Sequence, residues 1–318
     1  MFEKFKNFGY RRYIKFRYKF NKIIVKKKSR HIELDEIVSD LYDIGIKQGD
    51  IILVHSSLKS IGYVKGGPNT VINALLKIIG PEGTLVIPTF PLHNTMYELC
   101  TMKDYIFDYK TTPTGLGAIP SEFLKYNGIY RSIHPTHSIS AIGKYAKKIT
   151  ETHHIGNKTY GENSPWAKLI ELNGKILGIG ISLAWTTQYH HVEDIMGDNF
   201  PVKVKVDDIF NIKCKLDNEE IINVAVQPLD QEVAKTRIEK NPFINNYFWE
   251  IYNRLDILNL GKIGEAHSWW VDAKKFCEIL MVLAKLGITI YSTEEEIKSK
   301  GLYPFETIKN QLNIESDN

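Results

Sequence analysis

The sequence predicts an α/β fold: a central, mostly parallel or mixed sheet flanked by helices, with an inserted antiparallel β segment near 201–227. Short apolar runs, typical of buried strands, alternate with segments of helical spacing along most of the 318 residues. The apolar share of 43% is that of a globular protein, which excludes a disordered or fibrous chain. No apolar run approaches the ~20 residues that a membrane-spanning helix needs, so a transmembrane protein is excluded as well.

The first elements carry the clearest signals. Residues 32–47 have helical spacing, and the apolar run at 50–54 leads into a polar loop, as a buried strand does. Pro68 lies at the opening of a helix over 71–79, because proline is favoured where helices begin. A second buried strand, TLVIP, follows this helix.

The rest of the chain continues the alternation. We expect strands near 138–142 and at 175–179, and helices at 117–126, 143–151, 164–172, 187–196, 243–257 and 273–286. Residues 201–227 alternate and contain an Asp217-Asn218 turn, which predicts antiparallel strands inserted on the main sheet. Because no repeat or low-complexity linker interrupts residues 31–318, we expect one domain there, preceded by an arm.

Residues 1–30 form a basic arm that differs from the rest of the chain. The arm contains twelve basic residues and one acidic residue, Glu3, so its net charge is +11. The net charge of the remaining residues is −7. A helix would gather the apolar residues of the arm on one side, which suits peripheral contact with an anionic membrane surface. A helix packed on the body or on a neighbouring subunit fits the same pattern. The acidic body has no zinc-finger or RNP-like pattern, which argues against a nucleic-acid partner.

The cysteines and the N-terminus predict a cytoplasmic protein. Cys100, Cys214 and Cys277 are odd in number, scattered and without CxxC spacing, as reduced buried thiols are. The N-terminus has no apolar signal core. Together with the arm, these features predict a location in the cytoplasm or peripheral to the inner face of the membrane.

The segment TTQYHHVED, at 186–194, holds the densest cluster of catalytic residue types. On a helix, His190 and Glu193 share one face, and His191 and Asp194 share the next. An imidazole takes up a proton near neutral pH and a neighbouring carboxylate fixes its tautomer, so such a pair suits general-base chemistry. An ordinary surface helix explains the same spacing. A zinc site, with His153 or His154 as a further ligand, is less favoured, because HHxED lacks the i,i+4 histidines of a zincin helix.

Three loops carry groups that suit a ligand. The loop His55-Ser56-Ser57 follows a strand, and the turn Gly66-Gly67 opens a helix whose first amides suit a phosphate. Residues 131–138 bring a guanidinium, hydroxyls and two imidazoles in front of another strand. Local capping and a proline-bearing turn explain the same patterns. The sequence contains neither a Walker A loop nor a GxSxG elbow.

Taken together and in order, these segments resemble the aminoglycoside 3-N-acetyltransferase family, an antibiotic N-acetyltransferase group distinct from the GNAT fold. The resemblance extends from residue 32 to residue 290. It rests on LVHSSLKSIGYVKGGPNTVINALLKIIGPEGTLVIPTF at 53–90, PTGLGAIPSEFLK at 113–125, RSIHPTHSISAIG at 131–143, GENSPWAKLIELNGKILGIG at 161–180, TTQYHHVED at 186–194 and a weaker match, GKIGEAHSWWVDAKKF, at 261–276.

The resemblance implies transfer of an acetyl group from acetyl-CoA to a primary amine of an amino sugar, without a metal. Because no activated cysteine is evident, we expect direct transfer in a ternary complex, without an acetyl-enzyme. The HxxE pair of the family falls on His190, the general base, and Glu193, which orients it. The matching loops place the acetyl-CoA contacts at His55, Ser56, Ser57, Gly66, Gly67, Thr89, Arg131, Ser132 and Thr136. The Thr136 hydroxyl and loop N–H groups are candidate donors to the oxyanion. The acceptor contacts are placed at Phe90, His191 and Asp194, of which the last two depart from the usual family pattern.

Two classes of acceptor are open. The membrane-compatible arm favours a nucleotide-linked amino sugar of surface-polysaccharide biosynthesis, because late steps of such pathways take place at the cytoplasmic leaflet. An aminoglycoside, acetylated for antibiotic resistance, would instead favour the acidic body and Glu193, Asp194 and Asp198. Two further hypotheses do not involve acetyl transfer: a metal-dependent hydrolase and a non-catalytic CoA-binding protein. A homo-oligomer fits the sequence as well as a monomer does.

Overall fold

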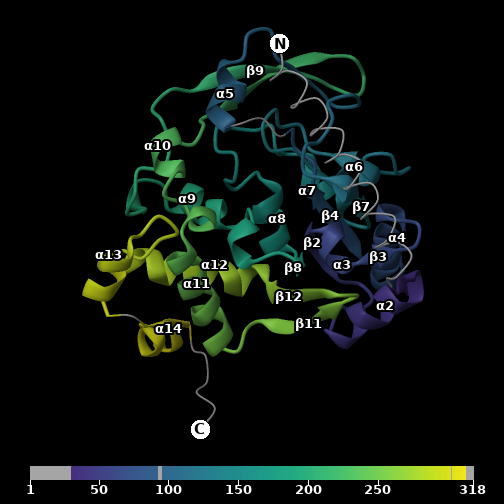
Figure 1. Ribbon diagram of the computed structural model, residues 1–318. Helices are drawn as coiled ribbons and strands as arrows, with labels where there is room; N and C mark the ends of the chain where they lie inside the picture. Colours follow the sequence, from purple (N-terminus) through teal and green to yellow (C-terminus); the bar gives the residue numbers. More distant parts are fainter. Residues whose placement is uncertain (1–29, 92–94, 302, 313–318) are drawn as a thin grey trace, which may run out of the picture.

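A seven-stranded mixed sheet lies at the centre of the computed structural model, which describes residues 30–91, 95–301 and 303–312 (Figure 1). In sheet order its strands are β11 (Asn259–Ile263), β12 (Ala266–Asp272), β8 (Lys175–Ile179), β2 (Ile51–Ser56), β4 (Thr84–Pro88), β7 (Ile139–Gly143) and β6 (Tyr130–Arg131). β2 pairs in parallel with β4 and β8, and the other neighbours pair antiparallel. The predicted class, a mixed sheet flanked by helices, is confirmed.

The central strand β2 shows that both faces of the sheet are covered. Ile51 and Leu53 pack into one apolar cluster and Ile52 and Val54 into another, since side chains alternate along a strand. All four side chains are buried. A strand covered on both faces is apolar throughout, which is why this run was recognisable in the sequence.

Three helices cover one face of the sheet: α2 (Leu34–Asp43), α4 (Pro68–Ile79) and α6 (Ala118–Phe123). α4 begins with Pro68 in its first turn, where the missing N–H would have had no intrahelical partner. It ends before Gly80, whose φ of 64° is the left-handed conformation that glycine adopts most easily. The start and the end of this helix are therefore set by local sequence.

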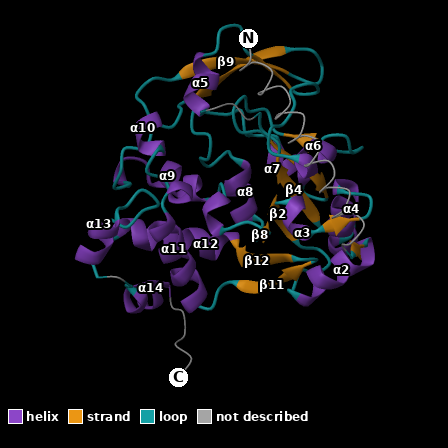
Figure 2. Cartoon of the chain, in the orientation of Figure 1, coloured by secondary structure: helices purple, strands orange, loops and turns teal. Residues whose placement is uncertain are grey.

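The opposite face carries a thicker helical layer (Figure 2). It consists of α7 (Ala146–Thr150), α8 (Pro165–Glu171), α9 (Tyr189–Met196), α11 (Pro242–Arg254), α12 (Ala273–Lys285), α13 (Glu294–Ser299) and α14 (Phe305–Leu312). The shorter elements are β1 (His31–Ile32), α3 (Leu58–Ile61), β3 (Tyr63–Val64), α5 (Met96–Thr101), η1 (Leu183–Trp185), η2 (Gly197–Asn199), α10 (Gln231–Ala234) and η3 (Ile238–Lys240).

The inserted β segment is antiparallel, as the sequence predicts, but it does not extend the main sheet. β9 (Phe210–Lys215) and β10 (Ile221–Val226) pair antiparallel, and β9 also pairs in parallel with β5 (Ile106–Asp108). The expectation that residues 201–227 lie on the main sheet is therefore wrong. The reason is a separate apolar cluster, in which Phe107 of β5 packs with Cys214 and other inward-facing residues of the hairpin.

The predicted helices and strands of the body are present, most of them with slightly shorter bounds. No helix in the described ranges is long and apolar enough to cross a membrane. Of the basic arm, only Arg30 is described, and its guanidinium pairs with Glu36 at 2.9 Å. The rest of residues 1–30 lies outside the described residues, so the helix expected there and its separation from 31–318 stay predictions.

Candidate active site

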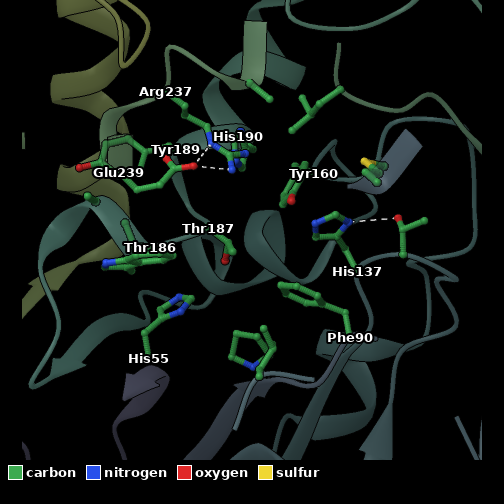
Figure 3. Close-up of a pocket in the computed structure, with 18 of the residues that line it drawn as sticks. His55, Phe90, His137, Tyr160, Thr186, Thr187, Tyr189, His190, Arg237 and Glu239 are labelled. Atoms are coloured by element: carbon green, nitrogen blue, oxygen red, sulfur yellow. Dashed lines mark hydrogen bonds and ion pairs between the residues drawn. The ribbon is translucent and has the colours of Figure 1, made fainter. Parts of the chain in front are cut away.

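A cleft of about 400 Å³ opens where the parallel strands end (Figure 3). His55 and Ser56 come from the end of β2, Phe90 follows β4, and Ile181 follows β8. Open α/β sheets bind their ligands beyond the carboxyl ends of parallel strands. Five of the residues predicted for the site line this cleft: His55, Ser56, Phe90, Thr136 and His190.

α9 places His190 at the cleft and Glu193 directly behind it. Both side chains are buried, and His190 Nδ1 lies 2.8 Å from Glu193 Oε2. The two residues share a face of the helix because three positions make nearly one turn, as the sequence predicts. The second carboxylate oxygen, Oε1, accepts a hydrogen bond of 2.8 Å from the hydroxyl of Tyr291.

These contacts determine which nitrogen of His190 can act as a base. Nδ1–H donates to the carboxylate, so Nε2 is left to accept a proton. Tyr291, which belongs to the segment after α12, holds the other side of the carboxylate. Glu193 and Tyr291 are 98 positions apart, so no local pattern in the sequence indicates this partner.

His191 and Asp194 lie on the adjacent face of α9 and contact the backbone of Tyr160. His191 Nδ1–H donates to the Tyr160 carbonyl over 2.6 Å, and Asp194 Oδ2 accepts from the Tyr160 amide over 2.7 Å. Asp194 also pairs with the ammonium of Lys205. Neither His191 nor Asp194 is among the described residues that line the cleft. Their predicted contact with the acceptor gains no support here, because both side chains are engaged in holding Tyr160.

Tyr160 forms the wall of the cleft between two imidazoles (Figure 3). Its ring centroid lies 5.0 Å from that of His190 and 5.3 Å from that of His137, while Trp166 packs behind it at 4.4 Å. Burial raises the pKa of the Tyr160 phenol well above its ordinary value, so the phenol is neutral. Sequence reasoning missed Tyr160, because nothing near it in the chain indicates a site.

The loop 134–137 brings a second imidazole to the cleft. His134 Nδ1 accepts from the amide of His137 over 3.1 Å, so the Thr136 hydroxyl, 3.3 Å away, donates to this nitrogen as well. His137 Nδ1, 3.0 Å from the same hydroxyl, is then the protonated nitrogen and donates to it. The only proton of the Thr136 hydroxyl already has an acceptor, so its predicted role as an oxyanion donor gains no support. Burial, followed by the charge of His190, holds the pKa of His137 well below its ordinary value.

Three buried polar atoms on cleft-lining residues have no hydrogen-bond partner in the described part of the chain: His55 Nε2, the Thr186 hydroxyl and the Tyr189 hydroxyl. Burial lowers the pKa of His55 to about 4, so its imidazole is neutral at pH 7. Buried polar groups in folded proteins are nearly always paired. These three atoms, all on cleft-lining residues, are the groups that a bound polar ligand would satisfy.

Thr89, Arg131 and Ser132 are not among the cleft-lining residues. The Arg131 guanidinium donates to the carbonyls of Thr89 and Thr112 over 2.9 and 2.6 Å, and burial lowers its pKa to about 10. The Ser132 hydroxyl lies 2.8 Å from His153 Nδ1. These side chains hold neighbouring loops together, so their predicted contacts with acetyl-CoA gain no support from this arrangement.

Ser57, Gly66 and Gly67 also lie off the cleft lining. The Ser57 hydroxyl accepts a hydrogen bond of 2.9 Å from Ser60. Gly66 and Gly67 have φ values of 83° and 66°, and this left-handed turn leads the chain into α4. Their contact with acetyl-CoA stays a prediction.

No group of three metal-ligating side chains that could hold an ion is found among the described residues. His153, a ligand in the less favoured zinc hypothesis, has both ring nitrogens engaged. Nδ1 lies 2.8 Å from the Ser132 hydroxyl, and Nε2–H donates to the Thr159 carbonyl over 2.8 Å. His153 is therefore a structural histidine of the core.

Several relatives by sequence are named as aminoglycoside N(3)-acetyltransferases. The chain is 34% identical over 173 residues to "Aminoglycoside N(3)-acetyltransferase III" of Serratia marcescens, a match that covers 51% of this chain and 64% of the relative. It is 32% identical over 169 residues to "Aminoglycoside N(3)-acetyltransferase IX" of Micromonospora chalcea, covering 49% of this chain and 60% of the relative. The chain thus matches less than two thirds of the length of these curated relatives.

Solved structures match over a longer stretch. The structure described as "AAC-VIa bound to Sisomicin" superposes with a TM-score of 0.66 at 25% identity, covering 78% of this chain and 95% of its own. The one described as "AAC-IIIb binary with CoASH" has a TM-score of 0.69, covers 83% of this chain and 100% of its own, and at 24% identity shows the shared fold.

The family model described as aminoglycoside 3-N-acetyltransferase matches residues 53–284. That range contains the end of β2, α9 and most of the cleft lining. The resemblance seen in the sequence is thereby confirmed over well more than half of the chain. This chain belongs to the aminoglycoside 3-N-acetyltransferase family.

Proposed function

We propose that this protein transfers an acetyl group from acetyl-CoA to a primary amine of an amino sugar. The single observation that carries the proposal is the chain of contacts from the cleft through His190 to Glu193 and Tyr291. A histidine general base needs a free ring nitrogen at the site and a neighbour that stabilises the positive charge it gains. His190 Nε2 provides the first, and the carboxylate of Glu193 provides the second.

The reaction follows from ordinary acyl-transfer chemistry. The amine attacks the thioester carbonyl, a carbon–nitrogen bond forms, and the amine proton passes to His190 Nε2. The tetrahedral intermediate then collapses, the carbon–sulfur bond breaks, and the CoA thiolate leaves with the electron pair and takes up the proton held by His190, which returns the imidazole to its neutral form. Glu193 stabilises the imidazolium that forms between these steps.

A direct transfer is favoured over an acetyl-enzyme. A cysteine that carried the acetyl group would have to react as its thiolate. Burial raises the pKa of Cys100, Cys214 and Cys277 to about 12 in each case, so all three stay protonated at neutral pH. None of them is among the described cleft-lining residues.

The polar atoms without partners support acetyl-CoA as the donor. The His55 Nε2 atom and the hydroxyls of Thr186 and Tyr189 suit a ligand rich in amide and carbonyl groups, such as the pantetheine arm. The names of the relatives favour an aminoglycoside as the acceptor, and the structure of one of them contains sisomicin. The comparisons do not support the nucleotide-linked amino sugar that the basic arm suggested.

The test is an acetyl-CoA thiol-release assay with a panel of amino sugars. We expect turnover with at least one amine and a loss of at least ~100-fold in kcat for His190→Ala, the usual contribution of a positioned base. The matched control is His267→Ala, because His267 is exposed on β12 and is not among the described residues that line the cleft. Near-normal kcat in His190→Ala would contradict the assignment of the base.

The same assay separates the other classes. A protein that only binds CoA would release no thiol with any amine. A metal-dependent hydrolase would lose activity after exhaustive chelation, whereas the proposed base chemistry keeps its activity.

A further inference from the structure

A second imidazole, that of His137, lines the cleft opposite the catalytic helix (Figure 3). Its ring packs against Phe90 at a centroid distance of 4.6 Å and against Tyr160 at 5.3 Å. Its Nδ1–H donates to the Thr136 hydroxyl over 3.0 Å. Its Nε2 has no hydrogen-bond partner in the described part of the chain, and Figure 3 shows this nitrogen directed into the cleft, away from the bond to Thr136.

The loop behind His137 determines which of its nitrogens carries the proton. His134 Nδ1 accepts from the His137 amide, so the Thr136 hydroxyl donates to it and in turn accepts from His137 Nδ1–H. The far end of this chain is fixed, because the His134 ring stacks on that of His153 at 4.4 Å. A neutral imidazole carries one proton, so His137 Nε2 presents a lone pair to the cleft.

His137 does not compete with His190 for the proton of the reaction. Burial lowers the pKa of His137 well below its ordinary value, and the charge of His190 lowers it further. A proton on His190 therefore makes a proton on His137 less favourable still. One imidazole of the cleft takes up a proton, while the other keeps its lone pair.

The position of His137 favours the acceptor over acetyl-CoA as its ligand. The Tyr160 ring lies between the two imidazoles, so an amine at His190 brings its sugar close to His137. The unpaired polar atoms that suit the pantetheine arm lie on the other side of the cleft in Figure 3, on His55, Thr186 and Tyr189.

The chemistry of the cleft also suits an acceptor with several amines. Glu239 is the only carboxylate among the described lining residues, and it already accepts from the Arg237 guanidinium over 2.7 Å. Further ammonium and hydroxyl groups of an amino sugar must therefore find neutral acceptor atoms. The lone pair of His137 Nε2 is such an atom, and a hydrogen bond from an ammonium is stronger than one between neutral groups.

We propose that His137 is a specificity-determining residue, whose Nε2 accepts a hydrogen bond from a second ammonium or hydroxyl group of the acceptor while His190 takes the proton of the reacting amine. The inference rests on the proposed acetyl transfer. Thr136 is a positioning residue, because its oxygen keeps the proton of His137 on Nδ1. The bond orients the sugar, so acceptors with a donor at the right distance from the reacting amine are preferred.

Calorimetry with the full chain, CoA and sisomicin tests the role of His137, together with steady-state kinetics. His137→Phe keeps an aromatic ring against Phe90 and Tyr160 but removes the lone pair. We expect the Kd and the KM for sisomicin to rise at least ~10-fold, the usual effect of losing a hydrogen bond to a charged group, while the Kd for CoA and kcat change little. His137→Gln should recover part of this loss, because its carbonyl oxygen can replace Nε2 as an acceptor.

Two substitutions at Thr136 test the chain behind the nitrogen. Thr136→Val keeps the shape of the side chain but cannot accept from His137 Nδ1–H, so sisomicin should bind more weakly. Thr136→Ser keeps the hydroxyl and should recover most of the binding. The matched control is His154→Phe, because His154 is partly buried, as His137 is, but is not among the described residues that line the cleft.

The outcomes of these experiments are distinct. Weaker CoA binding in His137→Phe, with sisomicin binding unchanged, would assign Nε2 to the cosubstrate and overturn the inference. A loss of kcat as large as that of His190→Ala would contradict it, because the ring would then act in the proton transfer. Equal losses of sisomicin binding in His137→Phe and His137→Gln, or no loss in either, would show that the lone pair binds no acceptor. Absence of thiol release with every amine is a different result, since it removes the proposed function itself.

Discussion

Glu193 joins two groups that the chain keeps far apart, and this determines how the base works. One oxygen of its carboxylate accepts from His190 and the other from Tyr291, each over 2.8 Å. A carboxylate held at both oxygens cannot rotate away from the imidazole. His190 Nδ1 therefore keeps its proton, and Nε2 keeps its lone pair toward the cleft.

Loss of the Tyr291 hydroxyl should lower turnover without changing substrate binding. We expect Tyr291→Phe to lower kcat by ~10-fold, because a charge-assisted hydrogen bond that orients the carboxylate is lost, and to leave the KM for acetyl-CoA unchanged. Glu193→Gln should lower kcat further, and His190→Ala further still. Steady-state kinetics on the three variants checks the order.

The control for this series is Tyr247→Phe. The Tyr247 hydroxyl is buried on α11 and has no hydrogen-bond partner in the described part of the chain. Its removal should leave kcat unchanged. An equal loss of kcat in both phenylalanine variants would show that Tyr291 acts only through general packing.

At the scale of elements, α9 serves two purposes with two adjacent faces. One face carries the base pair, and the other binds the segment that contains Tyr160 through its amide and its carbonyl. Because both hydrogen bonds come from α9, the same helix positions the backbone of Tyr160 and the catalytic histidine.

Asp194 should be important for stability and for the shape of the cleft. Its loss leaves the partly buried ammonium of Lys205 and the amide of Tyr160 without this partner. We expect Asp194→Ala to lower the free energy of unfolding by about 3–5 kcal/mol, the usual cost of breaking a buried ion pair from one side. Urea denaturation measures this change.

A matched pair on the surface provides the comparison. Lys203 and Asp207 are both exposed and lie 2.6 Å apart. Asp207→Ala should change the free energy of unfolding by less than ~1 kcal/mol, because solvent screens an exposed pair. Similar losses in the two variants would mean that Asp194 does not act through the buried contacts.

At the scale of the whole molecule, charge is unevenly distributed along the chain. Residues 1–30 carry +11 and the remainder −7. Basic residues near an anionic bilayer contribute ~1 kcal/mol each, and this attraction weakens with salt. The distribution is compatible with an enzyme that works close to an anionic surface, and equally with an arm that binds the acidic body.

Vesicle sedimentation distinguishes these two roles of the arm. We expect the full chain to sediment with vesicles that contain anionic lipid, and the sedimented fraction to fall as salt is raised. Vesicles of neutral lipid should not bind the chain. A chain that begins at residue 30 should stay in solution and keep its kcat. Equal sedimentation of both forms would contradict the membrane hypothesis.

Local sequence determined the elements of this protein and the catalytic pair. Apolar runs and helical spacing predicted β2, α4, α8 and α9. Each pattern marks the side chains that the element buries against the neighbouring layer of the fold. His190 and Glu193 could be paired from their spacing alone, since a helix brings positions i and i+3 together. The family resemblance then added the reaction.

Tertiary structure decided everything that depends on contacts between distant segments. It placed Tyr291 on Glu193, turned Asp194 toward Tyr160 rather than the cleft, and buried Arg131 among backbone carbonyls. It also separated the hairpin at 210–226 from the main sheet. No local pattern encodes these outcomes, because each depends on which partner the completed packing leaves within hydrogen-bond distance.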